Sequence, residues 1–346
     1  MIELSIDQTL LNKAAAKPSS YAYIIEDNRL EEIFAQPGLC LKVSRKPLKK
    51  DQPVDKMGWG KVPLGELSRV QNIYAWYGLA PRVHSLALVN GRYAAQVVKM
   101  ARSKLKRQTR AILPLGEKYG VKPAKNWDLG ARNWVGHLFV DFSGLGFADI
   151  EETKARLVKE TYTRRGKFIG SAYQQVPELG IKGQRDMEHR IGAMQLSKVD
   201  FKGKTVLDIG CNLGAFSRYA VERGAVRVVG IDKATARLAH EVANWLGYWT
   251  IDYLSLSLPG GISLIKRETG IEQFDIVFAN AVVKHVGGYE PWITNLVAPD
   301  GTMFFEGHGK VQRGIYSQAL KENFSEVVKV GETTDNYTRE VFRCRR

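Results

Sequence analysis

The segment "VLDIGCNLGAF" at 206–216 places an acid and two glycines where an apolar strand is predicted to turn into a helix. Gly210 and Gly214 would let the backbone approach a ligand closely, with the N-terminus of the helix facing it. A second acid, Asp232, ends the next predicted strand, where a carboxylate can accept both hydroxyls of a ribose. Dinucleotide-binding proteins also use a glycine-rich turn, but with Gly-x-Gly-x-x-Gly spacing. The pattern around Asp208 therefore predicts a nucleoside site.

Three further polar residues follow predicted strands of the same region. Glu306 and His308 stand where the strand "TMFF" opens into Glu-Gly-His, and His285 follows the strand "FDIVFAN". In open parallel sheets, ligands bind at the carboxyl ends of the strands. All three residues are therefore candidates for a base that takes up a proton. The alternative for Glu306 and His308 is a capping carboxylate and a surface histidine.

The stretch "NWDLGARNWVGHLFVDFSG" at 126–144 suggests a different chemistry. Phosphoryl transfer needs a strand lysine that reaches the phosphates and a helix glutamate that holds it. It also needs an aspartate that positions the hydroxyl, and an Asn and an Asp that bind metal. In this order the chain offers Lys42, Glu66, Asp128, Asn133 and Asp141. The first two and the last two would bind ATP, with Asn133 and Asp141 holding Mg²⁺, while Asp128 would be catalytic.

Length and composition indicate a globular protein of two domains. The 346 residues are 44% hydrophobic and 25% charged, and no apolar run reaches the ~18 residues of a membrane span. The N-terminus lacks the continuous apolar core of a signal peptide. The three cysteines are widely spaced and indicate neither disulfides nor a zinc site. We therefore expect a cytoplasmic protein.

The positive charge is concentrated in the first part of the chain. The net charge is +15, and residues 1–150 hold 23 Lys and Arg against 13 Asp and Glu, a net charge of +10. The run "KMARSKLKRQTR" at 99–110 is especially basic. Such a run could neutralise the phosphates of a nucleic acid or an anionic glycan. It could equally be the solvated face of a helix.

The pattern of elements divides the chain into three segments. Residues 1–150 predict short strands and helices, with an Asn-Gly hairpin signal at 90–91. Residues 151–199 predict a helical connector. From 200 to 346, strands alternate with helices and end in an antiparallel hairpin, which is typical of a mostly parallel sheet covered on both faces. The predicted fold class is α/β, with a smaller α+β domain at the N-terminus.

The residues at 206–232, the segment "FDIVFANAVVKHVGG" and the final hairpin resemble the class I S-adenosylmethionine-dependent methyltransferases over about 200–346. The resemblance implies a Rossmann-like, seven-stranded sheet and S-adenosylmethionine as cofactor. The first acid and the glycines would border the methionine part, and the second acid would bind the ribose. The implied cofactor-binding residues are Asp208, Gly210, Cys211, Asn212, Gly214, Asp232, Lys233, Leu254, Ser255 and Asn280.

The preceding segment "SAYQQVPELGIKGQRDMEHR" at 171–190 is similar to Gly-Gln-Arg segments in some bacterial and phage methyltransferases, including relatives of the tRNA wobble-uridine enzymes. This similarity implies that the segment covers the cofactor. Arg185 would then pair with the methionine carboxylate, and Tyr173 would line the pocket. The alternative is a plain connecting helix.

The order of residues from Lys42 to Asp141, with "YGLAPRVHSL" at 77–86, resembles aminoglycoside-phosphotransferase-like and protein kinases in a reduced form. No glycine-rich phosphate loop precedes Lys42, and Asn126 stands where these families usually have His. These departures leave two alternatives. The domain either phosphorylates the acceptor with ATP and Mg²⁺, or it is a basic docking platform.

Two functions fit this combination, and both have an anionic acceptor. In the first, a kinase-like domain phosphorylates or docks a phosphorylated glycan or similar acceptor, and the C-terminal domain methylates it. In the second, a methyltransferase acts on RNA or another nucleic acid, whose phosphate backbone binds the basic N-terminal domain. A binding module with a structural cofactor is a third, non-catalytic alternative. The sequence does not indicate the oligomeric state.

Overall fold

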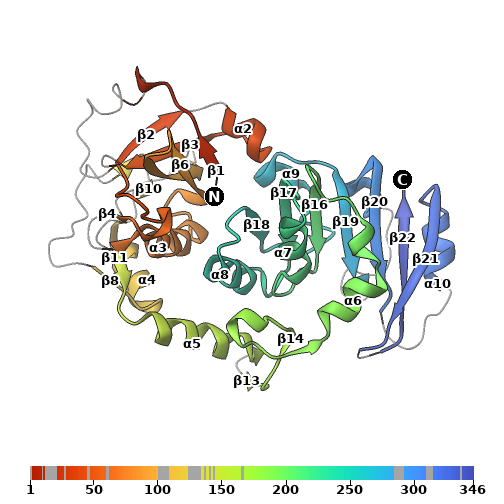
Figure 1. Ribbon diagram of the computed structural model, residues 1–346. Coiled ribbons are helices and arrows are strands. Elements are labelled where there is room, and N and C mark those ends of the chain that lie inside the picture. Colours follow the sequence, from red (N-terminus) through yellow and green to blue (C-terminus); the bar gives the residue numbers. More distant parts are fainter. Residues whose placement is uncertain are drawn as a thin grey trace. The chain divides into compact units, whose positions relative to one another are not determined.

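The structure is a computed structural model in which the chain forms two compact units, Met1–Ala155 and Arg156–Arg346 (Figure 1). The boundary lies inside helix α5 (Ile150–Thr161). Within the described residues, no helix is both long enough and apolar enough to cross a membrane. The structure describes residues 2–9, 11, 22–26, 29–44, 47–59, 62–99, 109–123, 134–135, 138–139, 142, 145–164, 167–283, 292–308, 315–335 and 337–346.

The N-terminal unit is built on a five-stranded sheet in the order β1-β6-β7-β3-β2. β1 pairs in parallel with β6, and the other pairs are antiparallel. Helix α3 packs against this sheet through β6 and against β11, and its residues Leu64, Leu67 and Val70 are buried. The elements of this unit are β1 (Ile2–Leu4), β2 (Ala22–Glu26), α2 (Arg29–Phe34), β3 (Leu39–Ser44), β4 (Gly58–Trp59), β5 (Val62–Pro63), α3 (Leu64–Trp76), β6 (Arg82–Val89), β7 (Tyr93–Lys99), α4 (Thr109–Lys118), β8 (Val121–Pro123), β9 (Trp134–Val135), β10 (Leu138–Phe139) and β11 (Leu145–Phe147).

The predicted Asn-Gly hairpin joins β6 to β7. Asn90 and Gly91 have φ angles of 50° and 62°, the left-handed pair that a type I′ turn needs. The Asn90 side chain also bonds both backbone groups of Ile6, at 2.6 Å and 2.9 Å, and so fixes the chain that follows β1. Helix α4 begins at the end of the basic run at 99–110, while 100–108 lie outside the described residues.

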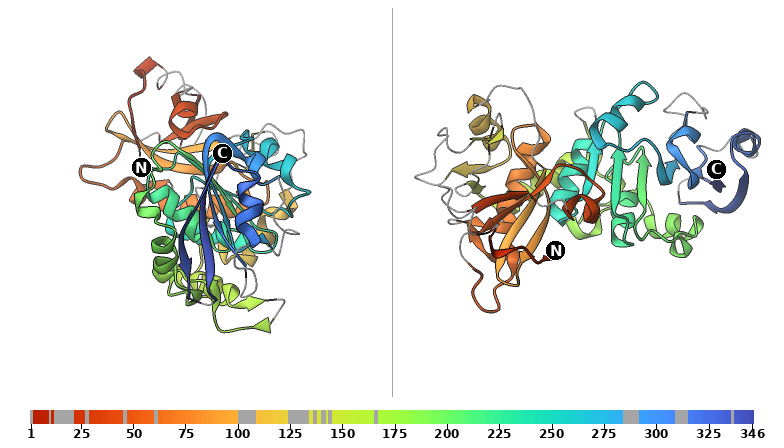
Figure 2. Two further views of the ribbon diagram at one scale, coloured as in Figure 1. Left: turned by 90° about the vertical axis from the view of Figure 1, so that its right-hand side faces the viewer. Right: turned by 90° about the horizontal axis from the view of Figure 1, so that it is seen from above.

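The C-terminal unit has the predicted seven-stranded sheet, in the order β18-β17-β16-β19-β20-β22-β21. The five strands from β18 to β20 are parallel, and β22 runs antiparallel to both of its neighbours. The β21–β22 hairpin, drawn in blue, is nearest the viewer in the left view of Figure 2. The strands are β16 (Thr205–Ile209), β17 (Arg227–Ile231), β18 (Ile251–Leu254), β19 (Phe274–Asn280), β20 (Val297–Glu306), β21 (Glu326–Thr333) and β22 (Arg339–Arg345).

Both faces of this sheet carry apolar side chains, as expected for parallel strands covered by helices. Leu207, Val277 and Phe305 belong to the larger cluster on one face. Aromatic rings continue the core elsewhere, because Phe278 lies 5.2 Å from Phe216 and 5.9 Å from Phe304 between ring centroids. The helices are α7 (Ala215–Glu222), α8 (Ala236–Leu246), α9 (Ile262–Thr269) and α10 (Ile315–Lys321).

The segment before the sheet departs from the predicted helical connector. It is helical in α5 and again in α6 (Met187–Ala193), but between them the chain forms short strands. β14 and β15 pair in parallel, with Gly183 opposite Ala172. Pro177 and the left-handed Gly180 (φ 67°) lie between these strands and end any helical pattern. The strands are β12 (Thr163–Arg164), β13 (Lys167–Phe168), β14 (Ala172–Gln174) and β15 (Gly183–Arg185).

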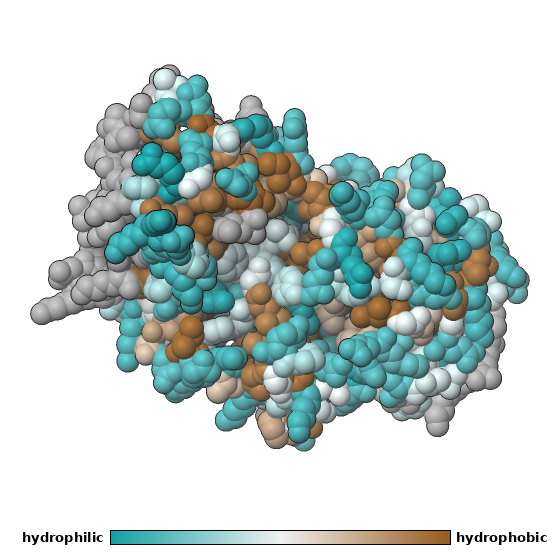
Figure 3. All heavy atoms as spheres, viewed as in Figure 1, coloured by the Kyte–Doolittle hydropathy of each residue, from teal (hydrophilic) through white to brown (hydrophobic). Residues whose placement is uncertain are grey.

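The surface mixes hydrophilic and hydrophobic side chains on the face drawn in Figure 3. Among the large apolar side chains of the described residues, Phe168 on β13 has the highest exposure, 66%. Its ring contacts Tyr162 edge-on, with 6.1 Å between centroids. Single apolar side chains on a surface are ordinary in globular proteins and need no ligand to explain them.

We expect Gly183→Ala to lower the free energy of unfolding by about 1–3 kcal/mol. A Cβ at this position would overlap the backbone of Gln174 and Gln175 across the β14–β15 pair, and backbone cannot move aside as a side chain can. Urea denaturation of the purified protein measures the loss. Gly192→Ala is the matched control, because a Cβ there meets no atom within 4 Å on helix α6. Equal stability of the two variants would contradict the close approach of β14 and β15.

Candidate functional site

The turn between β16 and α7 requires glycine at two positions. Gly210 and Gly214 have φ angles of 71° and 76°, and Asn212 between them has 51°. A Cβ at Gly210 would collide with the side chain of Val282, and a Cβ at Gly214 would collide with the ring of Tyr253. The backbone of this turn is thus packed at a distance that only glycine allows, at the carboxyl edge of the sheet.

Asp208 lies directly before this turn and is buried. Its carboxylate accepts a hydrogen bond from the Ser217 hydroxyl at 2.7 Å. Burial raises the pKa of Asp208 to about 6, because the Ser217 bond and the positive charge of Arg190 offset only part of the desolvation of the carboxylate. The group is therefore poised to gain or lose a proton just below neutral pH.

Asp232 follows β17 and is held by backbone groups. One carboxylate oxygen accepts from the N–H groups of Ala234 and Thr235, at 2.8 Å and 2.9 Å. The other accepts from the N–H of Asn212, at 3.2 Å. The loop after β17 is therefore bonded directly to the glycine turn after β16. Two carboxylate oxygens offer about four acceptor positions. Three are used, which leaves capacity for a donor from a ligand.

Two asparagines present polar atoms that the protein does not satisfy. Both side-chain atoms of Asn280, at the end of β19, are buried without a hydrogen-bond partner among the described residues, as is Oδ1 of Asn212. Buried polar groups are almost always hydrogen-bonded. Unpaired amide atoms beside two aspartates and a glycine turn therefore fit a polar ligand such as an adenosyl group.

The remaining predicted cofactor residues extend this edge. Ser255 donates to the backbone oxygen of Lys233 at 3.3 Å, which ties the ends of β18 and β17 together. Leu254 is partly buried against the main apolar cluster. Cys211 is fully buried, and burial raises the pKa of its thiol well above its usual value. The structure thus gathers the predicted residues of four neighbouring strand ends, while their contacts with a cofactor remain a prediction.

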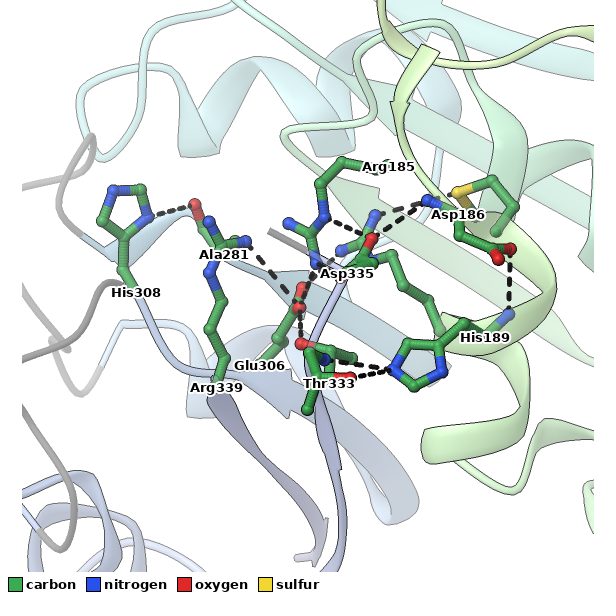
Figure 4. A network of polar contacts seen from close by, with 12 residues as sticks. Arg185, Asp186, His189, Ala281, Glu306, His308, Thr333, Asp335 and Arg339 are labelled. Atoms are coloured by element: carbon green, nitrogen blue, oxygen red, sulfur yellow. Dashed lines mark hydrogen bonds and ion pairs between the residues drawn. The ribbon is translucent and has the colours of Figure 1, made fainter. Parts of the chain in front are cut away.

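Glu306, at the end of β20, is the centre of a buried ionic network (Figure 4). Its Oε1 accepts from Arg185 at 2.7 Å and from the Thr333 hydroxyl at 2.6 Å, and its Oε2 accepts from Arg190. Burial alone would raise the pKa of Glu306, but Arg190 and Arg185, helped by Thr333, hold that pKa below its ordinary value. Glu306 stays ionised at neutral pH, so the structure favours a structural role over the predicted base.

Arg185 is fully engaged in the same network. Its Nε and Nη2 bind Asp335 at 2.7 Å and 3.0 Å, and its Nη1 donates to the Tyr173 hydroxyl at 2.7 Å. The predicted pairing of Arg185 with a methionine carboxylate would compete with these bonds. What the structure shows is a tie between β15, β20 and the end of the β21–β22 hairpin, which lie far apart in sequence (Figure 4).

The same segment also contacts the glycine turn. The buried Gln174 side chain accepts from the backbone N–H groups of Leu213 and Ala215, at 3.1 Å and 3.2 Å. Helix α7 has no side-chain cap of its own at Gly214, so Gln174 caps it from β14. Sequence reasoning missed Gln174, as well as Arg190 and Asp335. Their neighbours in "YQQ", "EHR" and "TTDN" carry no local signal of these long-range bonds.

His308 lies two residues after Glu306, and its Nδ1 is 2.9 Å from the backbone oxygen of Ala281. Because a carbonyl can only accept, Nδ1 carries the hydrogen and Nε2 is the nitrogen that could exchange a proton. Ala281 has an unusual φ of 57°, directly after Asn280. The third predicted base, His285, lies outside the described residues.

Two residues of the predicted phosphoryl-transfer set, Lys42 and Glu66, lie within the described part of the N-terminal unit. Lys42 lies on β3 and Glu66 on α3, and a Glu66 oxygen accepts from the backbone N–H of Phe147 at 2.8 Å. Asp128, Asn133 and Asp141 lie outside the described residues, so the Mg²⁺ site stays a prediction. Within the described ranges, no group of three or more His, Cys, Asp or Glu could hold a metal ion.

The order and direction of the strands define a Rossmann-like α/β domain. Residues 191–329 match the FtsJ-like methyltransferase family. The C-terminal unit therefore contains a methyltransferase domain of the S-adenosylmethionine-dependent class.

Curated relatives match the same region. The ribosomal protein L11 methyltransferase of Tolumonas auensis is 33% identical over 112 residues, which is 32% of this chain and 36% of that protein. The ubiquinone biosynthesis O-methyltransferase of Neisseria meningitidis is 33% identical over 129 residues, 34% of this chain and 51% of that protein. The chain thus spans about a third to a half of the length of these relatives.

Solved structures show a more distant likeness. WbdD in complex with the kinase inhibitor LY294002 is 18% identical, with 56% of this chain and 47% of that chain covered and a TM-score of 0.43. A ribosomal protein L11 methylase from Lactobacillus delbrueckii subsp. bulgaricus is 21% identical, with 46% and 78% covered and a TM-score of 0.37.

We expect Glu306→Gln to lower the free energy of unfolding by about 3–5 kcal/mol at pH 7, because two buried arginines lose their shared counter-charge. Chemical denaturation followed by circular dichroism measures the change. Glu326→Gln is the matched control. Glu326 pairs with Arg343 and Arg345 on the same sheet but is 41% exposed, so its loss should cost at most about 1 kcal/mol. Similar costs for both variants would contradict the central role of Glu306.

We expect Asp208 to make the protein less stable as pH rises from about 4 to about 6.5. The folded-state pKa of Asp208 is about 6 against an ordinary 3.8, so the folded state binds more protons in this window. Asp208→Asn removes this dependence. Its stability relative to wild type should increase with pH by about 3 kcal/mol across the window. Ser217→Ala should extend the loss of stability to higher pH, because it removes a hydrogen bond that lowers the pKa of Asp208. Parallel curves of unfolding free energy against pH for wild type and Asp208→Asn would refute the raised pKa of Asp208.

Proposed function

We propose that this protein transfers a methyl group from S-adenosylmethionine to an anionic acceptor. The observation that carries the proposal is the edge formed by Asp208, the glycine turn, Asp232 and Asn280. It combines a close-packed backbone, two carboxylates and unpaired amide atoms. This set matches the donors and acceptors of an adenosyl amino acid, which has hydroxyls, a charged amine and ring nitrogens. The match of 191–329 to the FtsJ-like family supports the same activity.

The bound cofactor would supply an electrophilic methyl group on a sulfonium centre. The residues of the chain would mainly bind and orient. Asp232 would accept from one ribose hydroxyl with its one remaining acceptor position, and Asp208 would favour the positive charge of the amino acid part when ionised. The asparagine side chains would satisfy their unpaired atoms on the ligand. Such alignment of the reacting groups is the main contribution that a protein makes to a direct displacement.

Whether the reaction needs a general base depends on whether the accepting atom carries a proton that must be lost. A hydroxyl or amine acceptor must lose a proton, and His308 is the described candidate, through Nε2. A phosphate oxygen is already ionised at neutral pH and needs no base. Because Glu306 is locked to two arginines, it serves neither route directly.

For the N-terminal unit we propose a kinase-like domain that phosphorylates or docks the acceptor, a phosphorylated glycan or a similar molecule. The placement of Lys42 on a strand and of Glu66 on the next helix along the chain supports this proposal. The bond from Phe147 to Glu66 also holds the helix close to the chain that follows Asp141. With ATP and Mg²⁺, Asn133 and Asp141 would hold the metal and Asp128 would position the hydroxyl.

The alternative is an RNA or other nucleic-acid methyltransferase in the cytoplasm. The net charge of +10 in residues 1–150 favours this alternative, because neutralised phosphates and released counterions drive binding. In that case the first unit would act as a basic platform, and its Lys42 and Asp141 would have no role with ATP.

Calorimetric titration with S-adenosylmethionine tests the proposed activity. Wild type should bind, and Asp232→Ala should weaken binding by about 10- to 100-fold, because the ribose loses a charged acceptor. Asp275→Ala is the matched control, since Asp275 lies near the start of β19, at the opposite end of the same sheet, and bonds Thr205. Absence of cofactor binding in wild type would refute methyl transfer.

The same calorimetry separates the two alternatives for the N-terminal unit. Binding of ATP with Mg²⁺ that is lost in Asp141→Ala would favour the kinase-like domain. Absence of ATP binding, together with RNA binding that weakens steeply with salt, would favour the nucleic-acid alternative.

A further inference from the structure

The ionic network around Glu306 contains more positive than negative groups. Three arginines, Arg185, Arg190 and Arg339, share two carboxylates, Glu306 and Asp335. All five side chains are at most 6% exposed. A charge removed from water is costly unless an opposite charge compensates it. Taken alone, these five described side chains carry one positive charge in excess, and Arg190 also compensates the buried carboxylate of Asp208.

Arg339 is the arginine that the network holds least closely. Its Nη1 lies 3.8 Å from Glu306, whose oxygens are already taken by the other two arginines and Thr333. Its Nε is buried and has no partner among the described residues. Its hydrogen bond to the Tyr173 hydroxyl is long, at 3.4 Å. By contrast, Arg185 makes two bonds to Asp335 of 2.7 Å and 3.0 Å.

Tyr173 adds a donor at the same place. Its oxygen accepts from both Arg185 and Arg339, which uses its two lone pairs. The hydroxyl hydrogen is then left to be donated, and within the described part of the chain it forms no hydrogen bond to another group. A guanidinium with an unused N–H beside a hydroxyl with an unused hydrogen is an arrangement that suits an oxyanion.

The position of Arg339 along β22 places it at the ligand edge of the sheet. Val341 lies opposite Glu306, the last residue of β20, and Arg339 lies further along, opposite Thr333 on β21. It therefore extends beyond the carboxyl end of β20, the side on which Asp208 and Asn280 stand. Figure 4 shows Arg339 beside Glu306, on the side of the network that faces Ala281 and His308.

We propose that Arg339 and Tyr173 form an oxyanion subsite of the methyltransferase site, which binds a carboxylate or a phosphate. The proposal rests on the proposed function of this edge. The anion has two possible sources, the carboxylate of S-adenosylmethionine and an anionic group of the acceptor. Either would place a negative charge beside Arg339, whose Nη1 is 3.8 Å from Glu306, and would accept the unused hydrogens of both residues.

Calorimetry with three probes tests the subsite in the full-length protein. The probes are S-adenosylmethionine, its decarboxylated form, and inorganic phosphate added to protein loaded with S-adenosylhomocysteine. Arg339→Gln removes the charge, Arg339→Lys keeps it, and Tyr173→Phe removes only the donor. Arg343→Gln is the matched control, because Arg343 lies on the same strand but is 36% exposed and pairs with Glu326. Thermal melting checks that every variant is folded.

The two sources give different results. If the anion is the cofactor carboxylate, Arg339→Gln should weaken S-adenosylmethionine by about 10- to 100-fold and leave the decarboxylated form within about twofold. If it belongs to the acceptor, both nucleosides should bind as in wild type, while phosphate binding is lost in Arg339→Gln and weakened in Tyr173→Phe. In both cases Arg339→Lys should retain more affinity than Arg339→Gln.

One result would overturn the subsite, namely unchanged binding of all three probes in folded Arg339→Gln. This outcome is distinct from failure of the proposed function, in which neither nucleoside binds to wild type. Phosphate binding that depends on Arg339 would support the subsite even then.

Discussion

The arrangement of the C-terminal unit depends on the buried carboxylate of Glu306. This group lies at the end of a central strand and binds one side chain from β15, one from α6 and one from β21. Each of these charged groups, the two arginines and the carboxylate, stays buried only because the others compensate its charge. An isolated charge in the protein interior costs several kcal/mol of folding free energy. The segment that contains β15 and α6, the sheet and the hairpin are thereby held in a single geometry.

The ligand edge itself is built from features that oppose stability. Asp208 is buried without an ion pair among the described residues, two glycines and an asparagine adopt left-handed backbone, and Asn280 keeps its amide unpaired. Each of these features costs folding free energy in the absence of a ligand. The surrounding apolar core offsets this cost in folding free energy. Gln174 also fixes the turn, because its side chain accepts from two backbone N–H groups.

The resemblance to class I methyltransferases implied the seven strands. The sequence itself was sufficient to predict a mostly parallel sheet and the strand ends where Asp208, Asp232 and Asn280 lie. These features follow from local patterns, namely apolar runs, helix-ending glycines and acids that follow strands. The short strands of the connector escaped prediction because β14 and β15 are three residues each and pair with one another rather than with the main sheet.

The ionic network escaped prediction for another reason. Arg185 and Glu306 are 121 residues apart, and nothing in either neighbourhood indicates the partner. The sequence therefore made Glu306 a candidate base and Arg185 a candidate cofactor ligand. The pairing of these two residues favours a structural role for both. It leaves Arg339, which has no motif around it, as the less constrained cation.

The order of strands has a consequence for biosynthesis. β22 follows β21 along the chain but lies between β21 and β20 in the sheet. A nascent chain that has reached β21 therefore still has a gap beside β20, with unpaired backbone groups on both sides. Arg339 enters only when the following strand closes this gap. A chain released before β22 would contain the glycine turn at 210–214 but would lack Arg339, and its sheet would have an open edge at β20.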